Sequence, residues 1–284
     1  MRSAADTDQS TPNQAERESG TIDEVLDLPG SFASRVLYFL DYLGGVVQLG
    51  LRTFRLAFKA PYDLGAILDQ VVRIGIESMS VATLTAIFSS MVITVQFAVQ
   101  LARFGAKDYV SSVVAISLVR ELGPVLTALM VGGRVGAGIA AELGSMTVTE
   151  QVDAIRSMGA DPVKKLVVPR VLAAIVVLPL LTIFADVLGV VGAMGIAKLA
   201  EGVNVTFFFN SVIEQVTVAD VIGGLTKTLF FGLSISLIAC YQGLATTNGT
   251  EGVGASTTRT VVITSVTTLI GDFILTSILL SFGL

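Results

Sequence analysis

Residues 78–102 read SMSVATLTAIFSSMVITVQFAVQLA, and no side chain in this stretch carries a charge. An α-helix rises about 1.5 Å per residue, so a helix of this length crosses the roughly 30 Å hydrocarbon core of a bilayer. In water such a helix, apolar all round, would have to be completely buried. The stretch therefore predicts a membrane-spanning helix and indicates an all-α integral membrane protein.

The composition of the whole chain supports this class. Of its 284 residues, 52% are hydrophobic and 14% are charged, with a mean hydropathy of +0.78, whereas a soluble domain carries about 25% charged residues. Four further apolar stretches have the roughly 17–25 residues that a span requires. They are residues 118–142, 171–197, 218–243 and 260–284. We therefore expect five spans.

Residues 32–59 precede the first span and have an amphipathic pattern. Apolar side chains recur every three or four positions, as on one face of a helix: Val36, Phe39, Leu40, Leu43, Val47, Leu51, Phe54 and Phe58. The basic side chains of another face are Arg52, Arg55 and Lys59. We interpret the segment as an amphipathic helix that lies in the cytoplasmic interface of the membrane and ends at Pro61. The alternative is a further span over residues 36–51, which is shorter than about 20 residues and contains Asp41.

Residues 1–30 form an acidic segment that accounts for the net charge of −5. Its two bases are Arg2 and Arg17, and its seven acidic residues are Asp6, Asp8, Glu16, Glu18, Asp23, Glu24 and Asp27. High net charge with few apolar residues predicts a disordered tail. The segment has neither the basic start nor the apolar core of a signal peptide, so we expect a cytoplasmic N-terminus.

The basic residues outside the spans indicate which side faces the cytoplasm. Twelve fall in the segments expected to be cytoplasmic: Arg2, Arg17, Arg35, Arg52, Arg55, Lys59, Arg73, Arg156, Lys164, Lys165, Arg170 and Arg259. Three fall in the outer loops: Arg103, Lys107 and Lys198. With five spans and a cytoplasmic N-terminus, the C-terminus is expected in the periplasm.

Residues missing from the sequence exclude several kinds of chemistry. The chain has no His, which excludes a Ser-His-Asp triad and an HExxH zinc site, and we expect no metal site and no catalytic residue. The single cysteine, Cys240, cannot form an intrachain disulfide. No phosphate-binding GxxxxGK[ST] loop is present, so if ATP drives this protein another chain must bind it.

Six charged residues fall inside the predicted spans. They are Arg120, Glu121, Arg134, Asp186, Lys227 and Asp272. Such a charge costs about 2.5–3.5 kcal/mol at the bilayer centre, so these side chains are expected to pair or to line a polar cavity. Asp272, in the middle of the last span, has the strongest need for a partner. A purely structural role, in which ion pairs lock the bundle, is the alternative.

Glycines and alanines recur at helical spacing in two spans. Gly132, Gly136, Ala140 and Gly144 repeat every fourth residue of the second span, and Gly189, Gly192 and Gly195 repeat every third residue of the third. Stripes of small residues allow helix backbones to approach closely. We interpret both as packing surfaces.

The loop between the second and third spans contains a short predicted helix over residues 147–159. Thr147 and Glu150 have capping-box spacing, Gly159 suits the C-terminal turn, and Pro162 stops the helix. An apolar face of Val152, Ile155 and Met158 makes this helix a shape that a second protein can bind. The alternative is a surface helix that rests on lipid headgroups.

The run from Arg120 to Arg170, RELGPVLTALMVGGRVGAGIAAELGSMTVTEQVDAIRSMGADPVKKLVVPR, resembles the signature of the MlaE/YrbE family. The segments TTRTVV (residues 257–262) and DFILT (residues 272–276) add to the resemblance, which covers residues 35–284. Members of this family are permeases of ABC-type lipid transporters that work with MCE proteins. The resemblance implies that residues 31–284 form one permease domain.

The family resemblance also implies partners and sites. It implies a homodimer in the bacterial inner membrane, an elbow helix and five spans in each copy, and a phospholipid cavity at the dimer interface. A separate ABC ATPase dimer would bind ATP and Mg²⁺, an MCE-domain oligomer would exchange the lipid on the outer side, and a STAS-domain protein often joins the ATPase. Such complexes maintain the lipid asymmetry of the envelope.

Site residues follow from matching this sequence to the family pattern. The lipid-cavity candidates are Arg120, Glu121, Lys227 and Asp272. The candidates for coupling to the ATPase are Glu150, Gln151, Val152, Asp153, Ile155, Met158 and Gly159. The resemblance gives no role to a cofactor on this chain, or to nucleic acid.

Two other functions are compatible with the residues alone. An ion-coupled secondary transporter would use Asp186, Lys227 and Asp272 and would work without nucleotide. A structural membrane scaffold would tolerate loss of the intramembrane charges. The odd number of spans, which argues against duplicated halves, and the short loop helix both weigh against the ion-coupled transporter.

Overall fold

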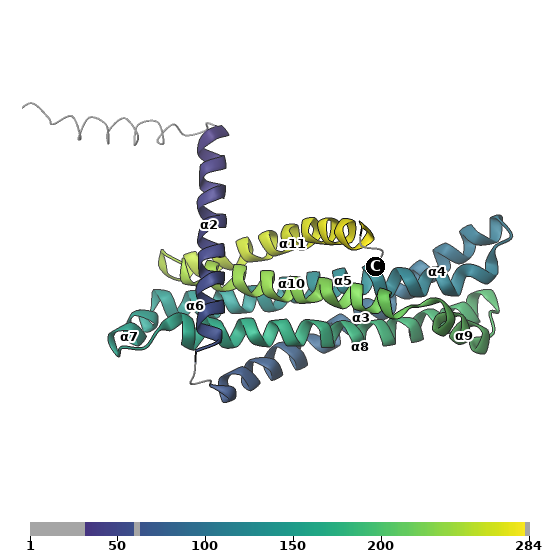
Figure 1. Ribbon diagram of the computed structural model, residues 1–284, viewed down its shortest axis with the longest axis horizontal. Coiled ribbons are helices and arrows are strands. Elements are labelled where there is room, and N and C mark those ends of the chain that lie inside the picture. Colours follow the sequence, from purple (N-terminus) through teal and green to yellow (C-terminus); the bar gives the residue numbers. More distant parts are fainter. Residues whose placement is uncertain (1–31, 60–62, 282–284) are drawn as a thin grey trace, which may run out of the picture. The chain divides into compact units, whose positions relative to one another are not determined.

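The computed structural model describes residues 32–59 and 63–281, and these residues are mostly helical and include no strand (Figure 1). The acidic tail predicted over residues 1–30 lies outside the described residues. The helices are α2 (Phe32–Ala57), α3 (Leu64–Arg103), α4 (Val110–Ser117), α5 (Gly123–Val131), α6 (Ala137–Val148), α7 (Gln151–Ser157), α8 (Val168–Glu201), α9 (Val205–Gln215), α10 (Val218–Leu244) and α11 (Gly249–Ser281). Three π-helical segments, η2 (Leu118–Leu122), η3 (Gly132–Gly136) and η4 (Val163–Val167), and a short 3₁₀ turn, η1 (Lys107–Tyr109), connect some of them.

Five helical stretches among the described residues are long and apolar enough to cross a membrane, which confirms the five predicted spans. They are Leu64–Arg103, Lys107–Val148, Val163–Ala200, Val218–Leu244 and Gly249–Ser281. Most extend beyond the predicted windows. The first begins at Leu64, not residue 78, because the helix continues through polar turns that contain Asp69, Arg73 and Glu77.

The chain divides into two compact units, residues 1–48 and residues 49–284, and the boundary falls within α2. The helix predicted over residues 32–59 is present as α2, which ends at Ala57. In the part of α2 that belongs to the second unit, Leu51 and Phe54 are exposed, as is Phe58 just after the helix, and an amphipathic helix against lipid requires such exposure. The interfacial position of α2 remains a prediction.

Helices α3 and α8 run in the same direction and pack along a stripe of mostly small side chains (Figure 1). The buried residues of α3 recur every fourth position: Ile74, Ser78, Ala82, Ala86, Ser90, Thr94 and Ala98. The Ser90 hydroxyl donates to the Gly189 carbonyl over 2.7 Å. Gly189 and Gly192 confirm the predicted packing stripe, but a side chain at Gly195 would meet nothing within 4 Å, so its inclusion was wrong.

The second predicted stripe packs against α10 and α11. A side chain at Gly132 or Gly136 would contact Thr264 or Thr260 of α11 and Ile235 of α10. The buried residues of α11 again recur almost every fourth position: Ser256, Thr260, Thr264, Thr268 and Gly271. Backbone approach through small residues therefore holds α6 and η3 to both C-terminal helices.

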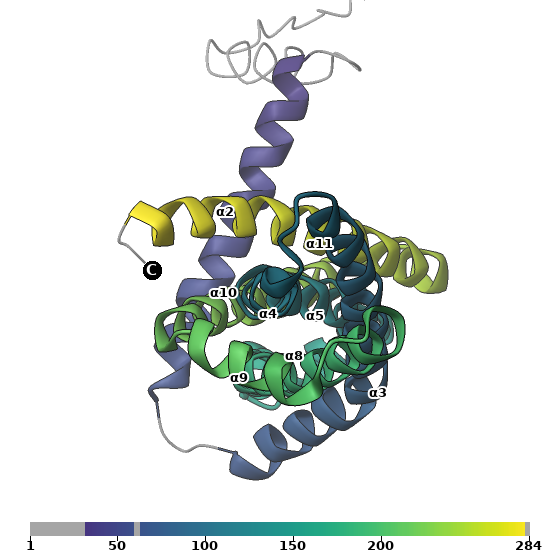
Figure 2. The same cartoon turned by 90° about the vertical axis from the view of Figure 1, so that its right-hand side faces the viewer.

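In the second unit, the short helices lie at the two opposite ends of the long helices. Helix α7 lies at one end, with the starts of α3, α8 and α11, and we call this the α7 end (Figure 1). Helices α4 and α9 lie together at the other end, the α9 end, which faces the viewer in Figure 2. The orientation of these ends relative to the cytoplasm remains a prediction from the distribution of basic residues.

Candidate functional site

A buried lysine joins three helical elements of the bundle. The side chain of Lys227, on α10, is 1% exposed. Its Nζ lies 2.6 Å from Glu121 Oε2 in η2 and 3.3 Å from Asp272 Oδ1 on α11, and it donates to the Arg120 carbonyl over 3.2 Å. The ammonium group therefore donates two hydrogen bonds, to Glu121 and to the Arg120 carbonyl, and forms an ion pair with Asp272. The expected need of Asp272 for a partner is met by Lys227.

A second ion pair lies about two turns earlier on α10, close to the start of the helix. Arg120 Nη1 is 3.4 Å from Asp220 Oδ1. Asp220 and Lys227 share a face of α10 because they are seven residues, about two turns, apart. Thr276, one turn after Asp272 on α11, donates to Glu121 over 3.3 Å. Together these contacts form a connected cluster of two cations and three carboxylates, which we call the charge cluster.

Local backbone structure brings the charge cluster together. Arg120 and Glu121 lie in the π-helical segment η2, a local irregularity that is frequent at functional sites. Gly224 lets α10 approach η2 closely, because a Cβ there would lie 2.5 Å from the Val119 carbonyl oxygen. This approach allows Lys227, one turn later, to reach both Glu121 and the Arg120 carbonyl.

The charge cluster borders a cavity of about 10 Å³. It is lined by Arg120, Glu121, Ala219, Asp220, Gly223, Lys227, Thr276 and Leu279. About 10–15 Å³ is enough for one water. The side chains of Arg120 and Glu121 are 27% and 34% exposed, so the cluster is accessible from outside the chain. A larger ligand would therefore have to be enclosed with the help of another surface.

The structure brings together four of the six predicted intramembrane charges: Arg120, Glu121, Lys227 and Asp272. The other two lie elsewhere. Arg134 is 3.8 Å from Glu77 of α3, and both are substantially exposed. Asp186 Oδ1 is buried, has no hydrogen-bond partner among the described residues, and occupies the space that a Cβ at Gly123 would need.

Sequence reasoning missed Asp220 and Thr276. Asp220 belongs to a capping box at the start of α10, where the Thr217 backbone N–H donates to its Oδ2 over 2.9 Å. The Thr-x-x-Asp spacing could have indicated this helix start. That the same carboxylate also meets Arg120, one hundred residues earlier, follows only from helix packing.

The expected capping box of the loop helix is wrong. Thr147 still belongs to α6, where its hydroxyl donates to the Leu143 carbonyl over 2.8 Å and to the Gly243 carbonyl over 3.2 Å. Glu150 makes the turn instead, with a left-handed φ of 60°, and its side chain caps nothing. The expected turn at Gly159 is confirmed by its φ of +78°.

The apolar face expected on this helix points mostly inward. Val152 and Ile155 are 5% and 8% exposed, whereas Met158 is 73% exposed. The expectation of one exposed apolar face was wrong because two of its three members pack on their own chain. The accessible candidates are Glu150, Gln151, Asp153, Met158 and Gly159.

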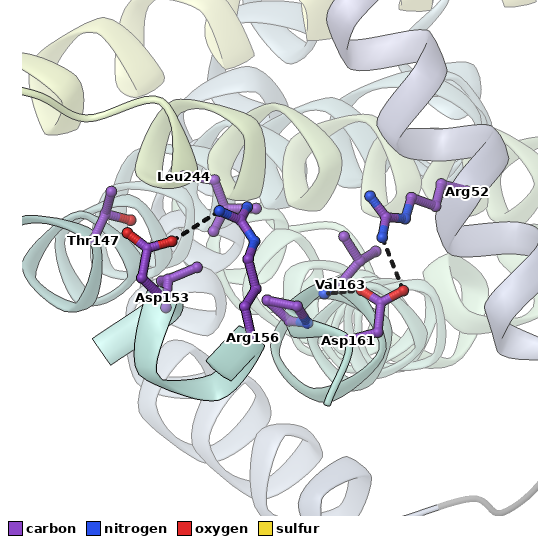
Figure 3. Close-up of a pocket in the computed structure, with 9 residues that line it drawn as sticks. Arg52, Thr147, Asp153, Arg156, Asp161, Val163 and Leu244 are labelled. Carbon is purple, nitrogen blue, oxygen red and sulfur yellow. Dashed lines mark hydrogen bonds and ion pairs between the residues drawn. The ribbon is translucent and has the colours of Figure 1, made fainter. Parts of the chain in front are cut away.

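A pocket of about 140 Å³ lies beside α7 (Figure 3). Asp153 pairs with Arg156 at 2.8 Å on α7, and Arg52 of α2 pairs with Asp161 at 2.9 Å. Both ion pairs border the pocket. The ion pair between Arg52 and Asp161 connects α2 to the segment that joins α7 to α8.

Glu142 links three helices near the same end. Its carboxylate lies 2.8 Å from Arg73 Nη1 of α3 and 3.1 Å from Arg170 Nη2 of α8. The Arg170 side chain is 5% exposed, so this pair is partly shielded from water. Glu142 is on α6, close to the turn into α7.

Five apolar helices with charges paired inside the bundle define a polytopic integral membrane protein. The chain belongs to the MlaE permease family, whose model, Permease MlaE, matches residues 67–278. This confirms the resemblance seen in residues 120–170.

Named relatives are similar over most of the chain. It is 40% identical to a probable ABC transporter permease protein of Rickettsia felis, over 89% of this chain and 98% of the relative. It is 44% identical to a probable ABC transporter permease protein of Rickettsia typhi, over 90% of this chain and 98% of the relative. It is 38% identical to the chloroplastic protein TRIGALACTOSYLDIACYLGLYCEROL 1 of Arabidopsis thaliana, over 74% of this chain and 60% of the relative. These similarities place the chain among the ABC transporter permeases.

Proposed function

We propose that this chain is the permease of an ABC-type transporter that moves phospholipid between the inner membrane and an MCE-domain protein, and so maintains envelope lipid asymmetry. The observation that carries this proposal is the partly accessible charge cluster around Lys227 inside a mostly apolar bundle. A phospholipid has a charged phosphate and apolar chains, so it suits a site of this mixed character. The name of the chloroplast relative contains trigalactosyldiacylglycerol, a diacylglycerol lipid with a sugar headgroup, and so supports lipid as the cargo without specifying a phosphate headgroup.

A homodimer would complete the lipid site. The cavity of one copy at the charge cluster is about 10 Å³, far too small for a lipid. Exposed apolar side chains of α11, among them Leu269, Phe273 and Ile274, flank the cluster in sequence and would supply walls for acyl chains. A second copy facing the first would enclose the lipid between them.

In the proposed mechanism the α7 end faces the cytoplasm and meets an ABC ATPase dimer, while the α9 end meets the MCE oligomer. ATP and Mg²⁺ are bound by the ATPase, which a STAS-domain protein joins. Nucleotide binding shifts the population of cavity states by a few kcal/mol, and α7 with Glu142 transmits the movement. The chain itself makes and breaks no covalent bond.

Mass spectrometry of the complex purified from its native membrane in mild detergent tests this function. We expect two copies of this chain, two ATPase subunits, an MCE oligomer and bound phospholipid. Recovery of this chain without an ATPase, from preparations in which other ABC transporters stay intact, would contradict the proposal. Nucleotide-independent, ion-dependent activity would instead indicate a secondary transporter.

Charge reversal on the exposed part of α7 is predicted to uncouple the ATPase. Asp153 is 66% exposed in its side chain and its ion pair with Arg156 lies at the surface, so Asp153→Arg combined with Met158→Arg should leave folding intact. Loss of a central interface contact weakens binding about tenfold or more. Copurification of the ATPase and ATP-driven lipid transfer in proteoliposomes measure the effect.

The control makes the same Asp→Arg change at the other end of the molecule. Asp108→Arg, on the exposed η1 turn near α4, should retain the ATPase. Val152→Arg is not a suitable test, because Val152 is buried and its replacement would disturb packing. Normal ATPase retention by the double variant would show that α7 is not the contact.

A further inference from the structure

A second pocket, of about 380 Å³, lies at the α7 end, separate from the charge cluster. Its walls come from the last turn of α2, the start of α3 and the segment that leads from α7 into α8. Three lysines line it: Lys59, Lys164 and Lys165. Apolar side chains, among them Leu56, Ile67 and Val168, complete the wall. Its volume lies in the range of pockets that hold small molecules.

The pocket has uncompensated positive charge. Asp161 pairs with Arg52 at 2.9 Å, and Asp63, which accepts the Ala66 N–H over 3.1 Å, leaves one negative charge against the three lysines. Within the described residues no ion pair joins any of the three lysines to a carboxylate. An anion between the three ammonium groups would offset their mutual repulsion.

The surroundings favour an anion that carries hydrocarbon. Two membrane-spanning stretches begin here, at Leu64 and Val163. Beside the pocket in sequence, Phe58, Leu64 and Leu68 are 69%, 67% and 62% exposed. An aqueous phosphate ion would gain nothing from this apolar surface. A lipid could place its headgroup among the lysines and its chains against these side chains, as basic pockets at the cytoplasmic ends of membrane helices do.

We propose that this pocket binds the phosphate headgroup of an anionic phospholipid from the leaflet at the α7 end. The lipid is a resident of the site and is distinct from the cargo at the charge cluster. It bridges the end of α2, the start of α3 and the loop after α7. This inference requires only that the chain is embedded in a membrane, so it stands independently of transport.

The test compares lipid binding by the wild type and by the triple variant Lys59→Gln/Lys164→Gln/Lys165→Gln. Proteins purified in detergent are titrated with phosphatidylglycerol, phosphatidylcholine or inorganic phosphate, and bound lipid per chain and the midpoint of thermal unfolding are measured. We expect the wild type to bind phosphatidylglycerol and to unfold at a higher temperature in its presence. The triple variant should bind it about a hundredfold more weakly, because each lysine near an anionic headgroup contributes about fivefold.

The matched control removes exposed basic residues from the α9 end. Arg103→Gln combined with Lys198→Gln should bind phosphatidylglycerol as the wild type does. Equal binding by the triple variant would overturn the proposal, and so would equal binding of phosphatidylcholine. A thermal shift with inorganic phosphate as large as that with phosphatidylglycerol would show a free-anion site in place of a lipid site. Absence of an ATPase from the purified complex would contradict the proposed transport function and would leave the proposed lipid site unchanged.

Discussion

Replacing Lys227 with Met is expected to abolish stable folding of the bundle or to lower its stability by about 3–5 kcal/mol, the cost of removing one member of a buried ion pair. Lys227 is 1% exposed and separates Glu121 from Asp272. Without its ammonium group the two carboxylates face each other across a low-dielectric interior, and the Arg120 carbonyl loses a donor. Yield in the membrane and thermal unfolding in detergent measure the loss.

A neutral version of the same cluster separates folding from function. The triple variant Lys227→Met/Glu121→Gln/Asp272→Asn leaves no unpaired charge, so we expect it to recover most of the lost stability. If the charge cluster binds lipid headgroups, the triple variant should fold but retain less phospholipid and transport it slowly. Wild-type transport by this variant would assign the cluster a purely structural role. Equal stability of the single variant and the wild type would contradict the burial argument.

Replacing Gly232 with Ala is the second change with a large expected effect. A Cβ at this position would lie 2.8 Å from the Ala174 carbonyl oxygen and 3.2 Å from the Ile175 Cα of α8. These are backbone atoms of a helix, so they cannot move aside as a flexible side chain can. Overpacking of this kind costs about 1–3 kcal/mol, and Gly232→Val should cost more. The midpoint of thermal unfolding should fall accordingly.

Gly195→Ala is the matched control, because it is the same change in a membrane helix with nothing within 4 Å of the new Cβ. It removes a flexible residue from a helix interior and should leave stability unchanged or raise it by up to about 1 kcal/mol. If Gly232→Ala and Gly195→Ala unfold at the same temperature, α8 and α10 do not pack as closely as described.

The sequence was sufficient for the fold class and for the five spans because a span is a local property. Length and hydropathy of one stretch decide whether it crosses a bilayer, and no knowledge of its neighbours is needed. The same reasoning identified Lys227 and Asp272 as residues that need partners, since the cost of a membrane-embedded charge depends on the solvent around it.

Partners could not be assigned in the same way. Lys227 and Glu121 are 106 positions apart in the chain, and their contact depends on Gly224 bringing α10 against η2. Asp220 caps the start of its own helix, and it also pairs with Arg120 one hundred positions earlier. The π-helical segment that orients Arg120 and Glu121 has no signature that hydropathy could detect.

In the loop between α6 and α8, too, one feature could be predicted from the sequence, whereas others depended on packing. Its turn at Gly159 was predictable because a positive φ favours glycine. The start of α7 was not, because Thr147 prefers two carbonyls of the packed α6 and α10 to the role of a cap. Likewise, periodicity grouped Val152, Ile155 and Met158 on one face, but only packing determined that the first two are buried.

By itself, then, the sequence determined that this protein is a five-span helical permease of recognisable family with a few obligatory intramembrane charges. The tertiary structure alone decided which charges meet, which face of α7 remains accessible and where three lysines gather around one pocket. The physical reason is that hydrophobic transfer acts on each segment separately, whereas ion pairs and close packing depend on distances between segments.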